Sequence, residues 1–259
     1  MSRSCLFPVA LLVVACYQNV QADDPKPGQQ VAQVFKNANS EEKLEYLLYL
    51  PETYGTVESG AAAAAAGSKS SDNAKSRFPL LLFLHGAGER GQNIALVKKH
   101  GPPKLIGQGQ QMPFIVVSPQ CPEKQRWEPS LLLALLDDLQ SRYAVDTARV
   151  YVTGLSMGGA GTWALVAATP DRFAAAVPIC GRTDPQVADV AARLPVWIIV
   201  GDRDNAALVS NSLEMADLLR AKQADVKLTV MHGIGHDSWT QSYGTPELYE
   251  WMLRHRREK

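Results

Sequence analysis

The chain has 259 residues, of which 46% are hydrophobic and 20% are charged, and its formal net charge is zero. This length is ample for one large hydrophobic core, and the composition is that of an ordinary globular protein. The balanced charge, with no basic stripe, argues against nucleic acid as a partner. No Cys and His residues have the spacing of a zinc site, so we expect neither a metal nor a cofactor.

The first 22 residues have the features of an export signal. Arg3 precedes an apolar run, Leu6 to Ala15, that is shorter than the ~20 residues of a membrane-spanning helix. Two cleavage sites stay open. Residues 20–22 (VQA) suit ordinary signal peptidase, whereas residues 13–16 (VVAC) resemble a bacterial lipobox and would make Cys16 a lipid anchor. Both predict an exported protein that is periplasmic, secreted or anchored at the cell envelope.

Residues 23–39 are polar and contain Pro25, Pro27 and Gly28, which predicts a linker. A single domain is expected over residues 40–259, beginning with a strand at 44–50. It is interrupted near residues 58–76 by a low-complexity, alanine-rich segment that we interpret as a surface insertion.

From residue 80 onward, short apolar runs alternate with amphipathic segments. Continuous apolar runs are typical of strands buried on both faces, and their alternation with helices indicates a mostly parallel sheet with helices on both sides. The sequence therefore predicts an α/β protein. The expected strands are 80–84, 114–117, 150–153, 174–179, 196–200 and 226–231, and the expected helices are 131–143, 159–168, 207–222 and 246–256.

Chemistry in such sheets gathers where the strands end. The strand at 150–153 is followed by GLSMGG (154–159), a G-x-S-x-G motif that also opens a helix. This context is typical of a sharp strand-to-helix turn that presents a nucleophilic serine. Ser156 is therefore the candidate nucleophile.

A serine hydroxyl needs a base, and histidine titrates near neutral pH. The strand at 226–231 ends at His232 and leads into a loop in which Gly233 and Gly235 precede His236. We expect His236 to be the base because this loop is long enough to return over Ser156. His232, at the strand tip, is the alternative.

The base needs an acid to orient it. The strand at 196–200 leads into GDRD (201–204), and Asp204 is our candidate because the loop must first turn outward at Gly201. Asp202 and Asp184 are the alternatives. The order Ser156, Asp204, His236 along the chain is the order of α/β-hydrolases.

The oxyanion of an acyl-transfer reaction needs N–H donors. The amide of Met157, directly after the nucleophile, is one candidate. The second should come from HGAGERG (85–91), where glycines allow a close backbone approach; we name Ala87, with Gly88 as the alternative, and expect His85 to hold this loop.

These segments, together with SPQCP (118–122), PICG (178–181) and GIGHDSW (233–239), resemble bacterial α/β-hydrolases of the dienelactone hydrolase and prolyl-oligopeptidase-like esterase group. The resemblance extends over roughly residues 40–259. It implies the α/β-hydrolase fold and a triad of Ser156, Asp204 and His236, but it does not fix the substrate.

The expected function is hydrolysis of carboxylic esters through an acyl-enzyme on Ser156, on a small-molecule or polysaccharide-linked substrate. A peptidase or acyltransferase with the same triad is the alternative, and a non-catalytic binding module on this fold is another. Trp127 and Trp239 either line the substrate site or pack in the core. A Cys121–Cys180 disulfide and the oligomeric state stay open.

Overall fold

The computed structural model describes residues 25–37, 41–55 and 76–258. Within them, eight strands form one sheet in the order β1-β2-β4-β3-β5-β6-β7-β8. Strand β2 runs antiparallel to β1 and β4, and all other neighbours are parallel. The strands are β1 (Gln30–Lys36), β2 (Lys43–Tyr49), β3 (Phe78–Leu84), β4 (Ile115–Pro119), β5 (Val145–Leu155), β6 (Ala175–Ile179), β7 (Val196–Gly201) and β8 (Val226–Met231).

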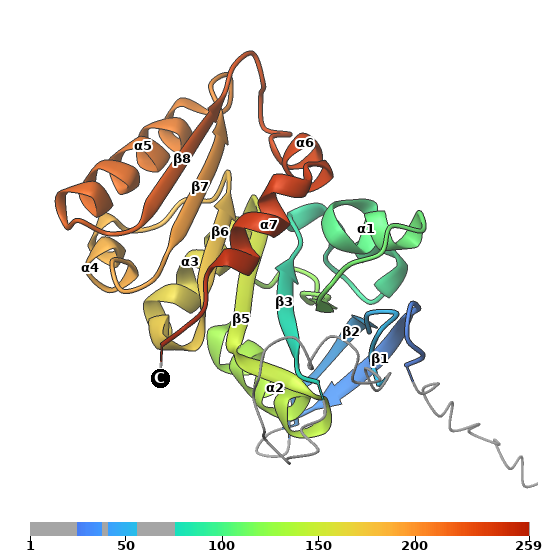
Figure 1. Cartoon of the computed structure of the whole chain (residues 1–259). Helices are drawn as coiled ribbons and strands as arrows, with labels where there is room; N and C mark the ends of the chain where they lie inside the picture. The colour runs from blue at the N-terminus through green and yellow to red at the C-terminus, as the bar shows by residue number, and fades with distance from the viewer. Residues whose placement is uncertain (1–24, 38–40, 56–75, 259) are drawn as a thin grey trace, which may run out of the picture.

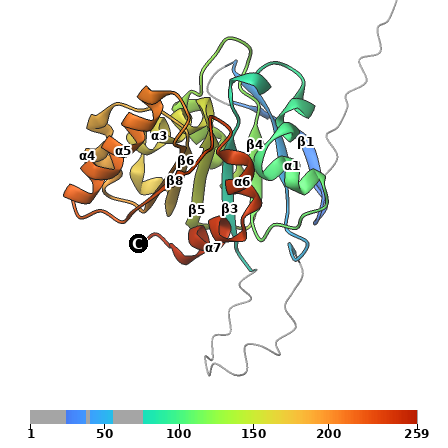
Figure 2. The same ribbon diagram turned by 90° about the horizontal axis from the view of Figure 1, so that it is seen from above.

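Helices cover both faces of this sheet, as Figures 1 and 2 show. One face packs on α2 (Pro129–Arg142), α3 (Met157–Ala168), α4 (Ala188–Ala191) and α5 (Ala206–Ala221), and the other on α1 (Gly101–Gly107), α6 (Trp239–Gly244) and α7 (Pro246–Arg254). The central strands β3, β4, β6 and β7 are buried almost throughout because both of their faces meet apolar side chains. The predicted α/β class with a mostly parallel sheet is confirmed.

The predicted linker over residues 23–39 is wrong in its second half. Residues Gln30–Lys36 form β1, which pairs with β2 along its whole length and buries Phe35. An edge strand pairs on one side only and buries few side chains, so its apolar pattern is weak and polar residues conceal it.

The long connection at residues 92–111 also contains structure that the sequence did not predict. A 3-10 helix, η3 (Ile94–Lys99), leads into α1, whose first turn holds Pro102 and Pro103. Proline is compatible with the first turn of a helix, although two prolines together suggest a loop. Because Ile106 of α1 packs into the core, this connection is part of the fold.

Some expectations concern residues outside the described part. The predicted export signal at 1–22, including Cys16, lies there, as do residues 56–75 of the predicted insertion. In the part of the chain that the structure describes, the helices are all too short or too polar to cross a membrane.

Candidate active site

Ser156 stands in the turn between β5 and α3. Its backbone angles are φ 54° and ψ −113°, a strained conformation for a residue with a side chain. The Ser156 amide donates to the Ile179 carbonyl at the end of β6 (2.9 Å), which fixes the turn against the neighbouring strand. The turn leaves the serine at the positive end of the α3 dipole, where negative charge is favoured.

Close backbone packing explains the glycines on both sides of this serine. A Cβ atom on Gly158 would lie 1.9 Å from the Leu84 carbonyl oxygen, and one on Gly154 would lie 2.3 Å from the Gly158 carbonyl oxygen. Neither separation is possible for a carbon and an oxygen that are not bonded to each other, so only glycine allows α3 to start against the end of β3. The motif thus places the nucleophile turn directly beside the loop that follows β3.

The structure brings Ser156, His236 and Asp204 together from three separate loops. His236, on the loop after β8, has its Nε2 atom 2.9 Å from Ser156 Oγ. Its Nδ1 atom lies 2.8 Å from Asp204 Oδ2, on the loop after β7. Because the carboxylate can only accept, Nδ1 carries the proton and Nε2 is left to accept from the serine hydroxyl. The geometry is that of a nucleophile, a base and an orienting acid.

Asp204 and His236 differ sharply in exposure. The Asp204 side chain is only 4% exposed, and its Oδ1 atom accepts the Asn205 amide at 2.6 Å, so both carboxylate oxygens are held. The His236 side chain is 44% exposed, which leaves the ring open to solvent on one side. The buried Asp204 carboxylate can therefore stabilise a positive charge on the His236 ring, while the exposed side of the ring stays accessible to water.

The alternative base and acid lie elsewhere. His232 Nδ1 is 2.7 Å from Asp202 Oδ2, and the His232 side chain is 96% exposed. Asp202 also accepts the Gly233 amide, which closes the start of the loop. Asp184 accepts the Gln186 amide at the start of η5 (Pro185–Val187). These three residues therefore have local structural contacts, and none of them is bonded to His236.

The candidate oxyanion donors each begin a helical element. Met157 is the first residue of α3, and Ala87 is the first residue of the 3-10 helix η2 (Ala87–Glu89). The first N–H groups of a helix have no partner inside it and are available to another acceptor. Leu84 and Gly154 are partners in the sheet, so the chain leaves β3 and β5 at the same level. The role of these two amides stays a prediction.

Comparison with known proteins agrees with this fold. The family model of the dienelactone hydrolase family matches residues 121–245, a stretch that contains Ser156, Asp204 and His236. A solved thermostable esterase superposes with a TM-score of 0.70 and 27% identity, covering 88% of this chain and 63% of that one. The chain has the α/β-hydrolase fold.

Curated relatives share only part of their length with this α/β-hydrolase. Poly(3-hydroxyalkanoate) depolymerase C of Paucimonas lemoignei is 32% identical over 114 residues, 40% of this chain and 28% of the relative. The bifunctional acetylxylan esterase/xylanase XynS20E of Neocallimastix patriciarum is 26% identical over 138 residues, 49% of this chain and 19% of the relative. The chain therefore spans less than a third of either.

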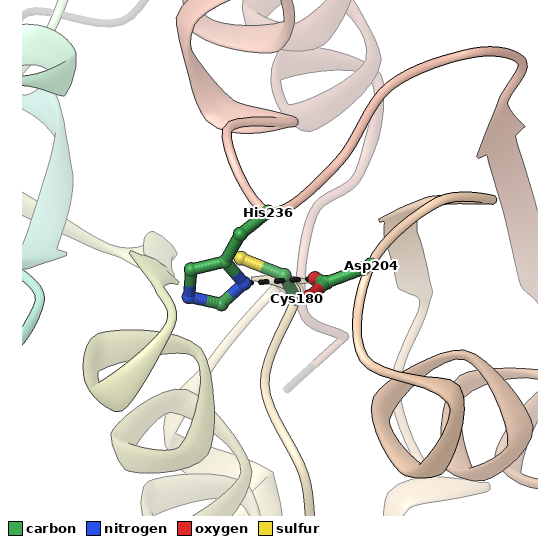
Figure 3. A group of neighbouring side chains, drawn as sticks. All are labelled: Cys180, Asp204 and His236. Carbon is green, nitrogen blue, oxygen red and sulfur yellow. Dashed lines mark hydrogen bonds and ion pairs between the residues drawn. The ribbon is translucent and has the colours of Figure 1, made fainter.

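A buried cysteine lies next to the triad of this α/β-hydrolase, and the sequence did not reveal it. Cys180 follows β6 with φ 42°, and its sulfur lies within 4.8 Å of ligand atoms of Asp204 and His236 (Figure 3). Such a set can hold a metal once the thiol is deprotonated. Burial raises the pKa of the Cys180 thiol to about 12, so the thiol keeps its proton at neutral pH. Cys121 and Cys180 are both free thiols, so the disulfide left open by the sequence is not formed.

Two aromatic residues considered in the sequence have different positions. The ring of Trp127 is buried and lies 4.8 Å from that of His85, so it belongs to the core. The half-buried Trp239 ring lies 5.2 Å from the His236 ring and 5.6 Å from the His100 ring, with both contacts edge-on. Trp239 therefore supports the base from the side, and His100 joins the site because α1 folds back toward α6.

Proposed function

We propose that this α/β-hydrolase cleaves carboxylic esters by forming an acyl-enzyme on Ser156. The observation that carries the proposal is the unbroken chain of contacts from Ser156 Oγ to His236 Nε2 (2.9 Å) and from His236 Nδ1 to Asp204 Oδ2 (2.8 Å). In this arrangement the nucleophile, the base and the group that orients the base are already within bonding distance.

In the first half of the reaction, Ser156 Oγ attacks the carbonyl carbon of the ester and its proton passes to His236 Nε2. The carbonyl oxygen becomes an oxyanion, which accepts from the amides of Met157 and Ala87. Asp204 stabilises the positive ring. The intermediate then collapses, the alkoxide leaves, and His236 Nε2–H donates its proton to it, so that an alcohol departs and the acyl group stays on Ser156.

The second half repeats these steps with water. A water molecule loses a proton to His236 Nε2 and attacks the acyl carbon. The new tetrahedral intermediate expels Ser156 Oγ, which takes the proton back from His236, and the carboxylic acid is released. The 44% exposure of the His236 side chain gives water access to the base, as this step requires.

The names of similar proteins support an ester as the substrate. A thermostable esterase, an acetylxylan esterase and a depolymerase of a polyester are among the similar proteins. Solved peptidases share the fold at 14–15% identity, which is evidence about the fold alone. We therefore place a small-molecule or polysaccharide-linked ester ahead of a peptide as the substrate.

The test compares p-nitrophenyl acetate and butyrate with peptide anilides, using wild type, Ser156→Ala and Ser130→Ala. Ser130 lies at the start of α2, where its hydroxyl donates to Glu128, so it is a matched serine outside the site. We expect wild type and Ser130→Ala to hydrolyse the esters, and Ser156→Ala to do so at least about 10⁴-fold more slowly. Turnover of anilides alone would favour a peptidase, and faster product formation with added alcohols would favour an acyltransferase. Failure of a fluorophosphonate to label Ser156 in the folded wild type would favour a binding module.

Export is a separate part of the proposal and follows from the sequence of residues 1–22. Signal peptidase cleavage after Ala22 would leave Asp23 as the first residue, whereas lipobox processing would leave a lipidated Cys16. The mass of the mature protein purified from an expressing bacterium distinguishes the two. Retention of an unprocessed chain in the cytoplasm would contradict both.

A further inference from the structure

Strand β8 forms a free edge of the sheet, although its sequence resembles that of a buried strand. It pairs with β7 on one side only, in unbroken register. Its sequence, VKLTVM, is largely apolar and contains no proline. All of its side chains are nevertheless partly exposed, and Val230 is 42% exposed. Proline, bulges and charged side chains are the usual means of keeping such an edge from pairing with another strand, and β8 has neither of the first two.

The one charged residue of β8 does not lie along the free edge. The Lys227 ammonium is 3.5 Å from the centre of the Trp197 ring and 2.6 Å from a Glu247 carboxylate oxygen. Trp197 is on β7 and Glu247 is on α7, so the ammonium is held on the inner side of β8 by partners within the same chain. The edge is therefore left without a charge that would repel another strand.

The backbone groups at the free edge belong to the apolar residues of β8. The Val196 amide of β7 donates to the Asp225 carbonyl at 2.9 Å, so the peptide groups of Asp225 face β7. The N–H and C=O of one strand residue point to the same side, and the side alternates along the strand. The odd-numbered residues of β8 therefore face β7. Val226, Leu228 and Val230 direct their N–H and C=O groups outward, where no residue that the structure describes bonds to them.

The side chains of the same three residues form an apolar row on the face of the sheet that α5 covers. Val226 and Leu228 pack against the core of that face, and Figure 1 shows α5 beside β8. Val230 lies on this face too, because side chains two positions apart in a strand share a face. A row of free backbone groups and a row of partly exposed apolar side chains thus coincide along one edge.

We propose that β8 is the interface with a second copy of this chain, whose β8 pairs with it in antiparallel orientation about a two-fold axis at Leu228. Leu228 then faces its own counterpart, and Val226 faces Val230 of the partner subunit. Each of these outward-facing residues exchanges both of its hydrogen bonds with the residue opposite, so no backbone group of the edge stays unpaired. A register shifted by two residues would leave one of the three without a partner.

The strand favours a second copy of itself because it is complementary to itself in this register. On the α5 face, apolar side chains meet apolar side chains. On the other face, Lys227 lies opposite Thr229 of the partner subunit, so like charges do not meet. The antiparallel arrangement also places the two loops that carry His236 at opposite ends of the paired strands, because each loop follows its own β8. The inference does not depend on the proposed function.

The register predicts which single cysteine can join two copies. Residues that exchange hydrogen bonds across an antiparallel pair have Cα atoms about 5.5 Å apart, which is within the range of a disulfide. Leu228→Cys should therefore give a disulfide-linked dimer under mild oxidation. Val230→Cys is the matched control: this position is more exposed, but its counterpart lies more than about 13 Å away along the pair. The two natural cysteines of the described chain are buried and do not compete. A mixture of Val226→Cys and Val230→Cys should cross-link as a mixed dimer.

Sedimentation velocity on the purified protein tests the association itself. We expect wild type to have twice the mass of one chain at about 20 µM, and Val230→Lys to raise the dissociation constant at least about tenfold, because each interface would then bury two ammonium groups opposite valines. Val34→Lys is the matched control, since Val34 is 50% exposed on β1 at the opposite edge of the sheet, and it should associate as wild type does. Circular dichroism establishes that each variant is folded.

Three results would overturn the inference. The first is a wild-type protein that has the mass of one chain at every concentration. The second is equal cross-linking of Leu228→Cys and Val230→Cys, which would indicate random collisions between copies. The third is an association that Val34→Lys weakens and Val230→Lys does not, which would place the interface at β1. If Val230→Lys does not fold, the cross-linking of the cysteine variants still decides the question.

Discussion

The two loops that meet at Ser156 are built in opposite ways. The loop at residues 85–93 is held from within: His85 and Glu89 are buried, and the Gln120 side chain donates to the carbonyls of Glu89 (2.8 Å) and Asn93 (2.9 Å). The loop at residues 232–238 is held mainly by backbone contacts, such as that from the Arg203 amide to the Ile234 carbonyl (2.9 Å), and His236 is exposed. The first loop presents fixed N–H groups, whereas the second carries a ring that exchanges protons with solvent. The difference matches the two tasks, because a stabilising dipole must be fixed and a base must be reached by water.

Replacement of the base on the loop at residues 232–238 should have the largest effect on activity. His236→Asn should lower kcat/KM for p-nitrophenyl acetate by about 10⁴- to 10⁶-fold, because Ser156 loses its base. The matched variant His232→Asn changes a ring on the same loop that is 96% exposed and pairs with Asp202, so its activity should stay near that of wild type. Steady-state kinetics on both proteins checks this, and a comparable loss in the two variants would show that the loop as a whole, rather than the His236 ring, is required.

Replacement of the acid should have the next largest effect. Asp204→Asn keeps the shape of the side chain but removes the charge that steadies His236, and a loss of about 10³- to 10⁴-fold in kcat is expected. Asp202→Asn is the control at the end of the same strand, where the aspartate accepts the Gly233 amide. Equal activity of the two variants would exclude Asp204 as the orienting acid.

A side chain added where α3 packs closely against the end of β3 should reduce the stability of the protein. Gly158→Ala places a methyl group 1.9 Å from the Leu84 carbonyl oxygen and should cost about 3 kcal/mol of the free energy of unfolding, together with activity. Gly244→Ala is the control, because nothing lies within 4 Å of the added atom, and it should change stability by less than about 1 kcal/mol. Urea denaturation measures both. A stable, active Gly158→Ala protein would show that α3 does not start this close to β3.

A pH effect on stability should come from His85. Its pKa falls from 6.5 to about 4 on folding because burial disfavours the charged ring; the nearby Glu89 carboxylate, 3.9 Å away, does not reverse this. The unfolded chain thus binds more protons between pH 6.5 and pH 4, and the contribution is complete above pH 6.5 and is lost as the pH falls. From pH 7 to pH 5 the loss is about 2 kcal/mol. His85→Gln should reduce the fall in unfolding free energy by this amount, and an unchanged pH dependence would contradict the buried neutral ring.

The same contrast explains what the sequence could predict. Ser156 and Asp204 follow buried apolar runs of β5 and β7, and His236 follows the partly buried edge strand β8. The positions of all three at strand ends determine where they meet. Strand β1 was missed because an edge strand has a weak apolar pattern, and α1 was missed because Pro102 and Pro103 suggest a loop.

The neighbours of the triad depend on tertiary structure alone. Cys180 reaches His236 through a turn with positive φ, and His100 reaches Trp239 because α1 packs on the same face as α6. The His85 ring contacts the carbonyl of its neighbour Gly86, yet it also accepts from the amide of Cys121, which is 36 positions away. No local pattern contains this information.

The most direct measurement is the site of acylation during turnover. Wild-type protein is mixed with p-nitrophenyl acetate, quenched in acid within the first turnovers, digested and examined by mass spectrometry. One acetyl group should appear on the peptide that contains Ser156, and it should be absent from Ser156→Ala. Release of p-nitrophenol at the wild-type rate with no acetyl group on Ser156, or with the label on another residue, would contradict an acyl-enzyme at this serine.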